Sequence, residues 1–173
     1  LTKKGDMFNK VVVAKFGGSS LADAEQFKKV KSIIMSDKRR RFIVPSAPGK
    51  RSNKDYKITD LFYMCHAHVK ENIPFDDVFG IIYKRYTEIA DELGIALDIR
   101  PYLEEVRENI ASGASSDYTA SRGEYLNGLI LSSYLGFEFV DPAELIYFDE
   151  LGHLDQKRTD KSVQQRLNAM ENA

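Results

Sequence analysis

Residues 11–20, VVVAKFGGSS, join a short valine-rich run to one lysine, two glycines and two serines. An unbroken apolar run of β-branched residues is typical of a strand buried on both faces of a parallel sheet. The glycines permit a tight turn, and residues 22–36 then carry apolar side chains at helical spacing. The segment therefore predicts a strand, a glycine turn and a helix, with Lys15 near the carboxyl end of the strand.

The rest of the chain repeats this alternation of strands and helices. A second apolar run at residues 41–47 predicts another buried strand, and Pro48-Gly49 ends it. The spacing of apolar residues predicts helices over residues 59–72, 75–93, 98–110, 116–135 and 161–170. Thr59 is expected to cap the first of these helices, and short strands are expected at 137–140 and 145–148. Strands separated by helices favour parallel pairing, so the predicted fold class is α/β, with αβα layers and a mainly parallel sheet.

Composition excludes several classes of protein. The 25 lysines and arginines nearly balance 26 aspartates and glutamates, which leaves no broad positive field for nucleic acid. No apolar run approaches the roughly 20 residues that a membrane helix needs. The single cysteine excludes an internal disulfide and suits a reducing compartment. We expect one globular, cytoplasmic domain with no nucleic-acid or membrane partner, preceded by a disordered leader at residues 1–9.

The segment Lys15-Phe16-Gly17-Gly18-Ser19 is a candidate anion-binding turn. Small residues after a buried strand allow backbone N–H groups to face outward, and a following helix N-terminus attracts anions such as phosphate. Lys15 adds a positive charge at the same end of the strand. A plain turn between strand and helix is the alternative interpretation. The segment is not a Walker sequence, because no Gly-Lys-Ser or Gly-Lys-Thr follows at the required spacing.

Polar residues at three other positions are candidate ligands of a small molecule. Ser46 ends the second strand, at the sheet edge where ligands bind in open α/β folds, and Thr59 begins the next helix. Asp117, Ser121 and Glu124 form one polar stripe on a predicted buried helix. A buried carboxylate needs a partner, which for Glu124 is a ligand ammonium, a structural Arg or Lys, or solvent. Caps and turns remain the simpler interpretation of Ser46 and Thr59.

Two further segments carry charged or metal-ligating side chains. Cys65-His66-Ala67-His68 resembles a metal motif, but its histidines project roughly 200° apart on a helix, so no metal site is expected. Residues 49–57 hold four cations and one anion and predict a mobile, exposed loop. Such a loop is placed to move over a site at the strand ends as a lid.

The strings KFGGSS at 15–20, SAPG at 46–49 with Thr59-Asp60, and SRGE at 121–124 occur in the order and spacing of one family. Together they resemble the N-terminal half of the aspartokinases, members of the amino acid kinase superfamily, and the resemblance runs from about Val11 to Val163. It implies phosphorylation of the β-carboxylate of L-aspartate by Mg-ATP, the first step towards lysine, threonine and methionine. It further implies that Lys15 and residues 16–19 meet the transferred phosphoryl group, and that Ser46, Thr59 and Glu124 surround aspartate.

The resemblance also sets expectations about the domain organisation. Residues 10–173 match the N-terminal, aspartate-binding part of an amino acid kinase domain, without the nucleotide-binding half or the regulatory ACT domains of the family. ATP and Mg²⁺ are therefore expected to be held mainly by a half that these residues do not contain, and no metal ligand is assigned here. The family resemblance leads us to expect a homo-oligomer for the full-length parent and no turnover from these residues alone. Two alternatives stay open: a kinase of another small carboxylate, carbamate or nucleotide, and a non-catalytic module for ligand binding or association.

Overall fold

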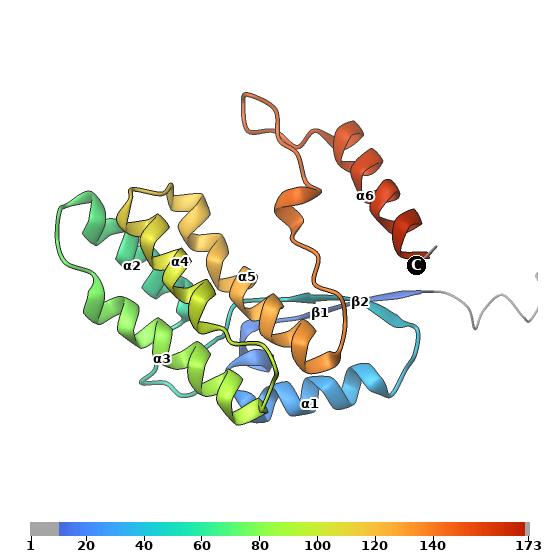
Figure 1. The fold of residues 1–173 in the computed structure, drawn as a ribbon, viewed down its shortest axis with the longest axis horizontal. Helices are drawn as coiled ribbons and strands as arrows, with labels where there is room; N and C mark the ends of the chain where they lie inside the picture. The colour runs from blue at the N-terminus through green and yellow to red at the C-terminus, as the bar shows by residue number, and fades with distance from the viewer. Residues whose placement is uncertain (1–10, 172–173) are drawn as a thin grey trace, which may run out of the picture. The chain divides into compact units, whose positions relative to one another are not determined.

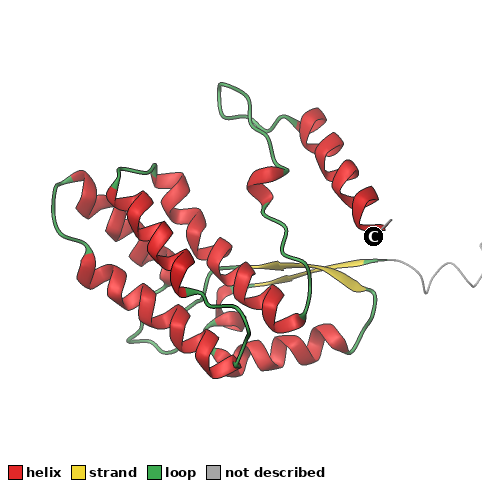
Figure 2. Ribbon diagram, in the orientation of Figure 1, coloured by secondary structure: helices red, strands yellow, loops and turns green. Residues whose placement is uncertain are grey.

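A computed structural model describes residues 11–171 of the chain, so the leader expected at residues 1–9 lies outside the described residues. The described chain forms two compact units, one extending to Glu138 and the other beginning at Phe139. Helix dominates, and the two strands are the short yellow segments of Figure 2. The α/β class is confirmed.

The sheet of the first unit consists of β1 (Val12–Phe16) and β2 (Arg40–Pro45), which pair in parallel. Lys15 lies opposite Val44 and Phe16 opposite Pro45 in the register. Both strands run towards the group of helices on the left of Figure 1, so their carboxyl ends face that group. The prediction that β1 is buried on both faces is wrong: Val13 is 65% exposed, and Val44 of β2 is 47% exposed.

The helix expected over residues 22–36 is confirmed to within two residues, and a short 3₁₀ helix precedes it. Gly18–Leu21 form a 3₁₀ helix, η2, and α1 (Ala24–Met35) begins only after it. Asp23 caps α1, since its side chain accepts a hydrogen bond from the Gln26 N–H at 2.9 Å. One turn of 3₁₀ helix therefore lies between Gly17 and the N-terminus of α1 at Ala24.

Four helices pack on one another beside the sheet: α2 (Ile58–Lys70), α3 (Asp76–Leu93), α4 (Arg100–Ala111) and α5 (Ser116–Leu135). The predicted helices are confirmed here to within two residues at most ends, and left-handed glycines at 94 and 136 end α3 and α5. The cap predicted at Thr59 is wrong. Lys57 precedes the first turn without any side-chain cap, and Thr59 lies inside it.

The core of the first unit follows from the apolar stripes of these helices. Leu103, Val106 and Ile110 of α4 are each at most 2% exposed, as their spacing predicts. Residues 126–131 of α5 are all buried, so this helix is enclosed on most sides from Leu126 onward. α5 also contacts β2, which brings its middle turns to the carboxyl end of the sheet.

The second unit contains a turn of 3₁₀ helix, η3 (Pro142–Glu144), and one α-helix, α6 (Gln156–Glu171). The strands predicted at 137–140 and 145–148 are wrong, because the only pairing among residues 139–171 is a single antiparallel bridge between Phe148 and Leu154. Thr159 of α6 accepts a hydrogen bond from the Tyr147 N–H at 3.0 Å and so fixes the turn before the helix. The final helix is confirmed and begins five residues earlier than predicted.

Candidate active site

Two glycines bring the turn after β1 against the loop after β2. The Gly49 N–H donates to the Gly18 carbonyl oxygen at 2.8 Å. A Cβ added at Gly18 would lie 2.7 Å from the Ala47 carbonyl oxygen, and one added at Gly49 would lie 2.7 Å from the Gly18 carbonyl carbon. Both positions therefore require glycine for close approach of the two backbones. This contact joins the predicted anion-binding turn to the Ser46–Gly49 loop.

Helix α5 holds the same loop from the other side. Glu124 Oε1 accepts a hydrogen bond from the Ala47 N–H at 3.2 Å, and Asn127 Nδ2 donates to the Ser46 carbonyl oxygen at 2.6 Å. Gly123 makes this approach possible, since a Cβ there would lie 2.7 Å from the Ala47 Cβ. Two residues of the SRGE string thus contact the loop. Glu124 accepts a hydrogen bond from it, and Gly123 packs closely against Ala47.

Helix α2 joins the arrangement through its first residue. The Ile58 N–H donates to the Pro48 carbonyl oxygen at 3.3 Å, which places Thr59 one residue from the loop that begins with Ser46. The Ser46 N–H donates to the Phe16 carbonyl oxygen at 2.9 Å and extends the β1–β2 pairing. The four segments that carry the predicted site residues therefore meet at the carboxyl ends of the strands.

The individual side chains differ in exposure. Lys15 is exposed at the end of β1, while Ser46 and Thr59 are partly buried. The expectation that Glu124 lies on a buried part of the helix is wrong: Glu124, Ser121 and Asp117 all lie on the exposed face of α5, where solvent is one of the expected partners. The reason is that α5 becomes enclosed only from Leu126 onward, so the first half of the helix keeps one side in solvent.

Two buried polar side chains support this region, and the sequence analysis did not select them. The Tyr86 hydroxyl of α3 donates to the Gly123 carbonyl oxygen at 2.7 Å. Burial, and then the nearby negative charge of Glu124, raise the pKa of Tyr86 well above its usual value. Asn127 is the second of these buried polar side chains. It could have been selected from the sequence, because it is the one polar side chain within the apolar run 126–131.

The third side chain that the sequence analysis missed is Arg85, which lies on the buried face of α3 with Tyr86. It forms an ion pair of 2.5 Å with Asp55, and Asp55 also accepts from the backbone N–H of Arg51 at 2.8 Å. The loop over residues 49–57 is exposed as predicted, except at Gly49 and Asp55, which are partly buried. Arg85 could have been noticed, because it follows Ile82 by three residues on an otherwise apolar face.

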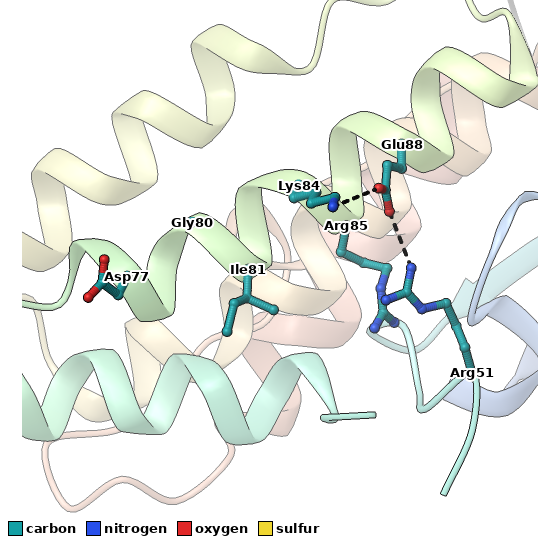
Figure 3. Close-up of a pocket in the computed structure, with 7 residues that line it drawn as sticks. All are labelled: Arg51, Asp77, Gly80, Ile81, Lys84, Arg85 and Glu88. Carbon is teal, nitrogen blue, oxygen red and sulfur yellow. Dashed lines mark hydrogen bonds and ion pairs between the residues drawn. The ribbon is translucent and has the colours of Figure 1, made fainter. Parts of the chain in front are cut away.

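A cavity of about 450 Å³ lies beside Arg85. Figure 3 draws the residues that line it. It is lined by Arg51, Asp77, Gly80, Ile81, Lys84, Arg85 and Glu88. None of the predicted site residues lines it. Glu88 pairs with both Arg51, at 3.2 Å, and Lys84, at 3.7 Å, so the charges around the cavity are largely satisfied by one another.

Metal ligands do not gather in the part of the chain that the structure describes: within residues 11–171 there is no group of three or more His, Cys, Asp or Glu that could hold an ion. Cys65 is buried, and burial raises the pKa of its thiol to about 12. His68 Nδ1 lies 2.9 Å from the Pro74 carbonyl oxygen. Between residues 11 and 171, no helix is both long and apolar enough to cross a membrane.

Comparison with known proteins places this geometry in a family. The model of the amino acid kinase family matches residues 10–172. Aspartokinase 3 of Bacillus subtilis is 32% identical over 146 residues, which are 76% of this chain and 32% of that protein. Aspartokinase 2, chloroplastic, of Arabidopsis thaliana is 33% identical over 134 residues, 71% of this chain and 24% of that protein. The chain thus spans between about a quarter and a third of the length of these curated relatives.

Solved structures show the same fold. The crystal structure of Clostridium acetobutylicum aspartate kinase is 64% identical with a TM-score of 0.87, over 90% of this chain and 36% of that one. Escherichia coli aspartokinase III, in complex with aspartate and ADP, has 21% identity and a TM-score of 0.73, over 94% of this chain and 39% of that one. The family model covers nearly every described residue, and the fold agrees with that of the solved kinases. This chain belongs to the amino acid kinase family and is similar to part of the aspartokinases.

Proposed function

We propose that the chain is the aspartate-binding part of a cytoplasmic aspartate kinase, which transfers the γ-phosphoryl group of ATP to the β-carboxylate of L-aspartate. The observation that carries this proposal is the meeting of four segments at the carboxyl ends of β1 and β2, held by the Gly18–Gly49 contact and by Glu124 and Asn127. Ligands of open α/β sheets bind at this edge. The similarity to the Clostridium aspartate kinase supports the choice of substrate.

The residues at this edge suit phosphoryl transfer. Such a reaction needs positioning and stabilisation of negative charge more than covalent chemistry. Lys15 supplies a positive charge beside the Gly17-Gly18 turn, where it would meet the negative oxygens of the transferred group. Backbone N–H groups of the turn would bind the same oxygens. Mg²⁺ would supply further charge neutralisation, and the described residues offer no cluster for it, so we assign no Mg²⁺ ligand to them.

Glu124, Ser46 and Thr59 would bind L-aspartate. The Ala47 N–H occupies one acceptor position of the Glu124 carboxylate, and a carboxylate has about four, so an α-ammonium group can bind as well. Exposure of Glu124 gives such a ligand access, and solvent hydrates the carboxylate, so it needs no internal cation as a partner. Ser46 and Thr59 would contribute hydroxyl groups to the substrate carboxylates.

Calorimetric titration of the purified chain with L-aspartate and with ADP tests this assignment. Glu124→Gln should weaken L-aspartate binding by tenfold or more and leave any ADP binding unchanged. Lys38→Ala is the control: Lys38 is exposed before β2, at the opposite end of the sheet. Equal L-aspartate affinity of the folded Glu124→Gln variant and the unsubstituted chain would remove Glu124 from the substrate site. Binding of another small carboxylate or a carbamate in place of L-aspartate would instead favour a related kinase.

Turnover is the second test. In a longer protein that contains these residues and is active, Lys15→Ala should lower kcat by about 10²–10³ and raise the aspartate KM much less. Residues 1–173 alone should bind substrate without turnover, because the matched part makes up only 24–32% of the length of these relatives. Turnover of about 1–100 s⁻¹ by these residues alone would show that they form a complete kinase.

A further inference from the structure

The guanidinium group of Arg85 is enclosed in the first unit. Arg85 is 2% exposed and lies on α3 beside the buried Tyr86 and Ile82. A charge in such a place is retained only when it is paired and hydrogen-bonded, because desolvation of an isolated ion costs several kcal/mol. Burial indeed lowers the pKa of Arg85, and the neighbouring charge of Arg51 lowers it further. The hydrogen-bond partners of the guanidinium group therefore indicate its structural role.

Three separate segments provide the acceptors. Arg85 Nη2 donates to Asp55 Oδ2 at 2.5 Å, and Nη1 donates to the carbonyl oxygens of Gly49 at 3.0 Å and Ala22 at 3.4 Å. Ala22 directly follows η2, Gly49 ends the loop after β2, and Asp55 lies in the cationic loop. A single planar group thus links the chain after β1 to the chain after β2.

Asp55 extends the same cluster to the loop surface. It accepts from the Arg51 backbone N–H at 2.8 Å and from Arg51 Nε at 3.1 Å. Burial alone would raise the pKa of Asp55, but these hydrogen bonds and the charge of Arg85 outweigh it and lower the pKa to about 2. Arg51 also pairs with Glu88, one turn after Arg85 on α3, as Figure 3 shows. The loop is therefore fastened to α3 at two successive turns.

The positions that Arg85 holds lie between two candidate substrate groups. Gly49 follows Ser46 by three residues, and Asp55 precedes Thr59 by four. Fixing Gly49 and Asp55 to one guanidinium group fixes the ends of the loop that separates Ser46 from Thr59. The hydrogen bond from Arg85 to the Ala22 carbonyl oxygen attaches the chain that follows Lys15 and the glycine turn to the same guanidinium group. Gly49 and Asp55 are both hydrogen-bonded to Arg85 of α3. This geometry argues against the prediction that the loop moves freely over the site as a lid.

We infer that Arg85 is a positioning residue for the candidate active site, acting through Gly49, Ala22 and Asp55 to hold the Ser46–Thr59 segment in place for L-aspartate. The inference rests on the proposed function for its substrate. The hydrogen bonds from Arg85 to Ala22, Gly49 and Asp55 do not depend on that function. Because Arg85 acts through its hydrogen bonds to the loop, its substitution should change the order of the loop and the affinity for substrate without altering which ligand is selected.

Amide hydrogen exchange of the purified chain, together with L-aspartate titration, tests the inference. Arg85→Met keeps an unbranched apolar side chain in place of the arginine stem and removes all donors, and Arg85→Lys keeps the charge without the planar fork of donors. In Arg85→Met, exchange at Gly49 and at residues 51–55 should accelerate tenfold or more relative to the core of α5. L-Aspartate affinity should fall tenfold or more, and Arg85→Lys should lie between. The control is Arg100→Met, which removes an exposed arginine paired with Asp91 and Asp98.

The outcomes separate positioning from a general effect on stability. If exchange in Arg85→Met accelerates equally at the loop and in the α5 core, Arg85 only stabilises the fold and the inference is overturned. Unchanged L-aspartate affinity of the folded variant overturns it as well. Should Arg85→Met fail to fold, Asp55→Asn removes the charged acceptor and must produce the same local exchange. If the unsubstituted chain binds no L-aspartate, the proposed function fails, and the exchange pattern alone then decides whether Arg85 holds the loop.

Discussion

Substitution of Gly123 by alanine should destabilise the first unit, although alanine is the better helix former. A Cβ at this position of α5 would lie 2.7 Å from the Ala47 Cβ, and ordinary contact begins at 3.4 Å. The helix and the loop would have to separate by about 0.7 Å, the difference between these two distances. The bond from the Ala47 N–H to Glu124, already 3.2 Å long, would then exceed hydrogen-bonding distance.

The expected magnitude is the difference between two opposing effects. Replacing a helical glycine by alanine stabilises by about 0.5–1 kcal/mol. Overpacking of a closely packed contact costs about 1–3 kcal/mol. The free energy of unfolding should therefore fall by up to about 2.5 kcal/mol.

Urea unfolding followed by far-UV circular dichroism measures this change, and α3 offers a matched control. Gly80→Ala makes the same replacement inside a helix where a Cβ would meet no atom within 4 Å, so it should stabilise by about 0.5–1 kcal/mol. A second control is the double variant Gly123→Ala/Ala47→Gly, which removes the colliding atom. Its stability relative to Ala47→Gly alone should show that Gly123→Ala no longer destabilises. If Gly123→Ala stabilises as much as Gly80→Ala, the close approach of α5 to the loop is refuted.

Three other substitutions or treatments have defined outcomes. Asp55→Asn should flatten the acid limb of the stability curve: the lowered pKa means that Asp55 stabilises above about pH 4, by at most about 2 kcal/mol, and that this contribution disappears as the pH falls towards 2. Urea titrations from pH 6 to about pH 2 would measure it, and parallel curves for variant and unsubstituted chain would contradict it. Tyr86→Phe removes the buried donor to the Gly123 carbonyl and should cost about 1 kcal/mol in thermal unfolding; an unchanged melting temperature would show that this bond contributes nothing. Cys65, whose pKa burial raises to about 12, should react with a thiol reagent at least 10³-fold more slowly in the native chain than in urea, and fast native labelling would show that α2 opens readily.

Local sequence patterns were sufficient for most elements of this fold. The valine run of β1, the glycines that end α3 and α5, and the apolar stripe of α4 each carry their own signal, independent of distant residues. The strands expected at 137–140 and 145–148 failed because an apolar run forms a strand only beside a partner. In the described second unit, Phe148 finds one bridging residue, Leu154, and is itself 62% exposed.

The sequence patterns predicted which segments form the candidate site. They did not predict the buried side chains that hold these segments in place. The strings around Lys15, Ser46 and Glu124 were identified from residue type, and the structure brings their segments together. Exposure of Glu124 could not be predicted, because helical periodicity does not tell how far along α5 its neighbours extend. Arg85 was missed for a related reason: its role depends on Asp55, 30 residues away, and no local pattern records that pairing.

The contacts that close the candidate site also determine when it can form during folding. The bond between Ala47 and Glu124 spans 77 residues and that between Ser46 and Asn127 spans 81, whereas α2, α3 and α4 are joined to their neighbours by short turns. Closing a flexible loop of that length costs about 4 kcal/mol in chain entropy by the logarithmic relation, and contacts of high sequence separation slow folding. During synthesis, the loop after β2 would leave the ribosome about 75 residues before its α5 partners. Any ligand that requires the assembled loop would thus bind only after α5 has docked, and its binding energy would be added to the last cooperative step of folding.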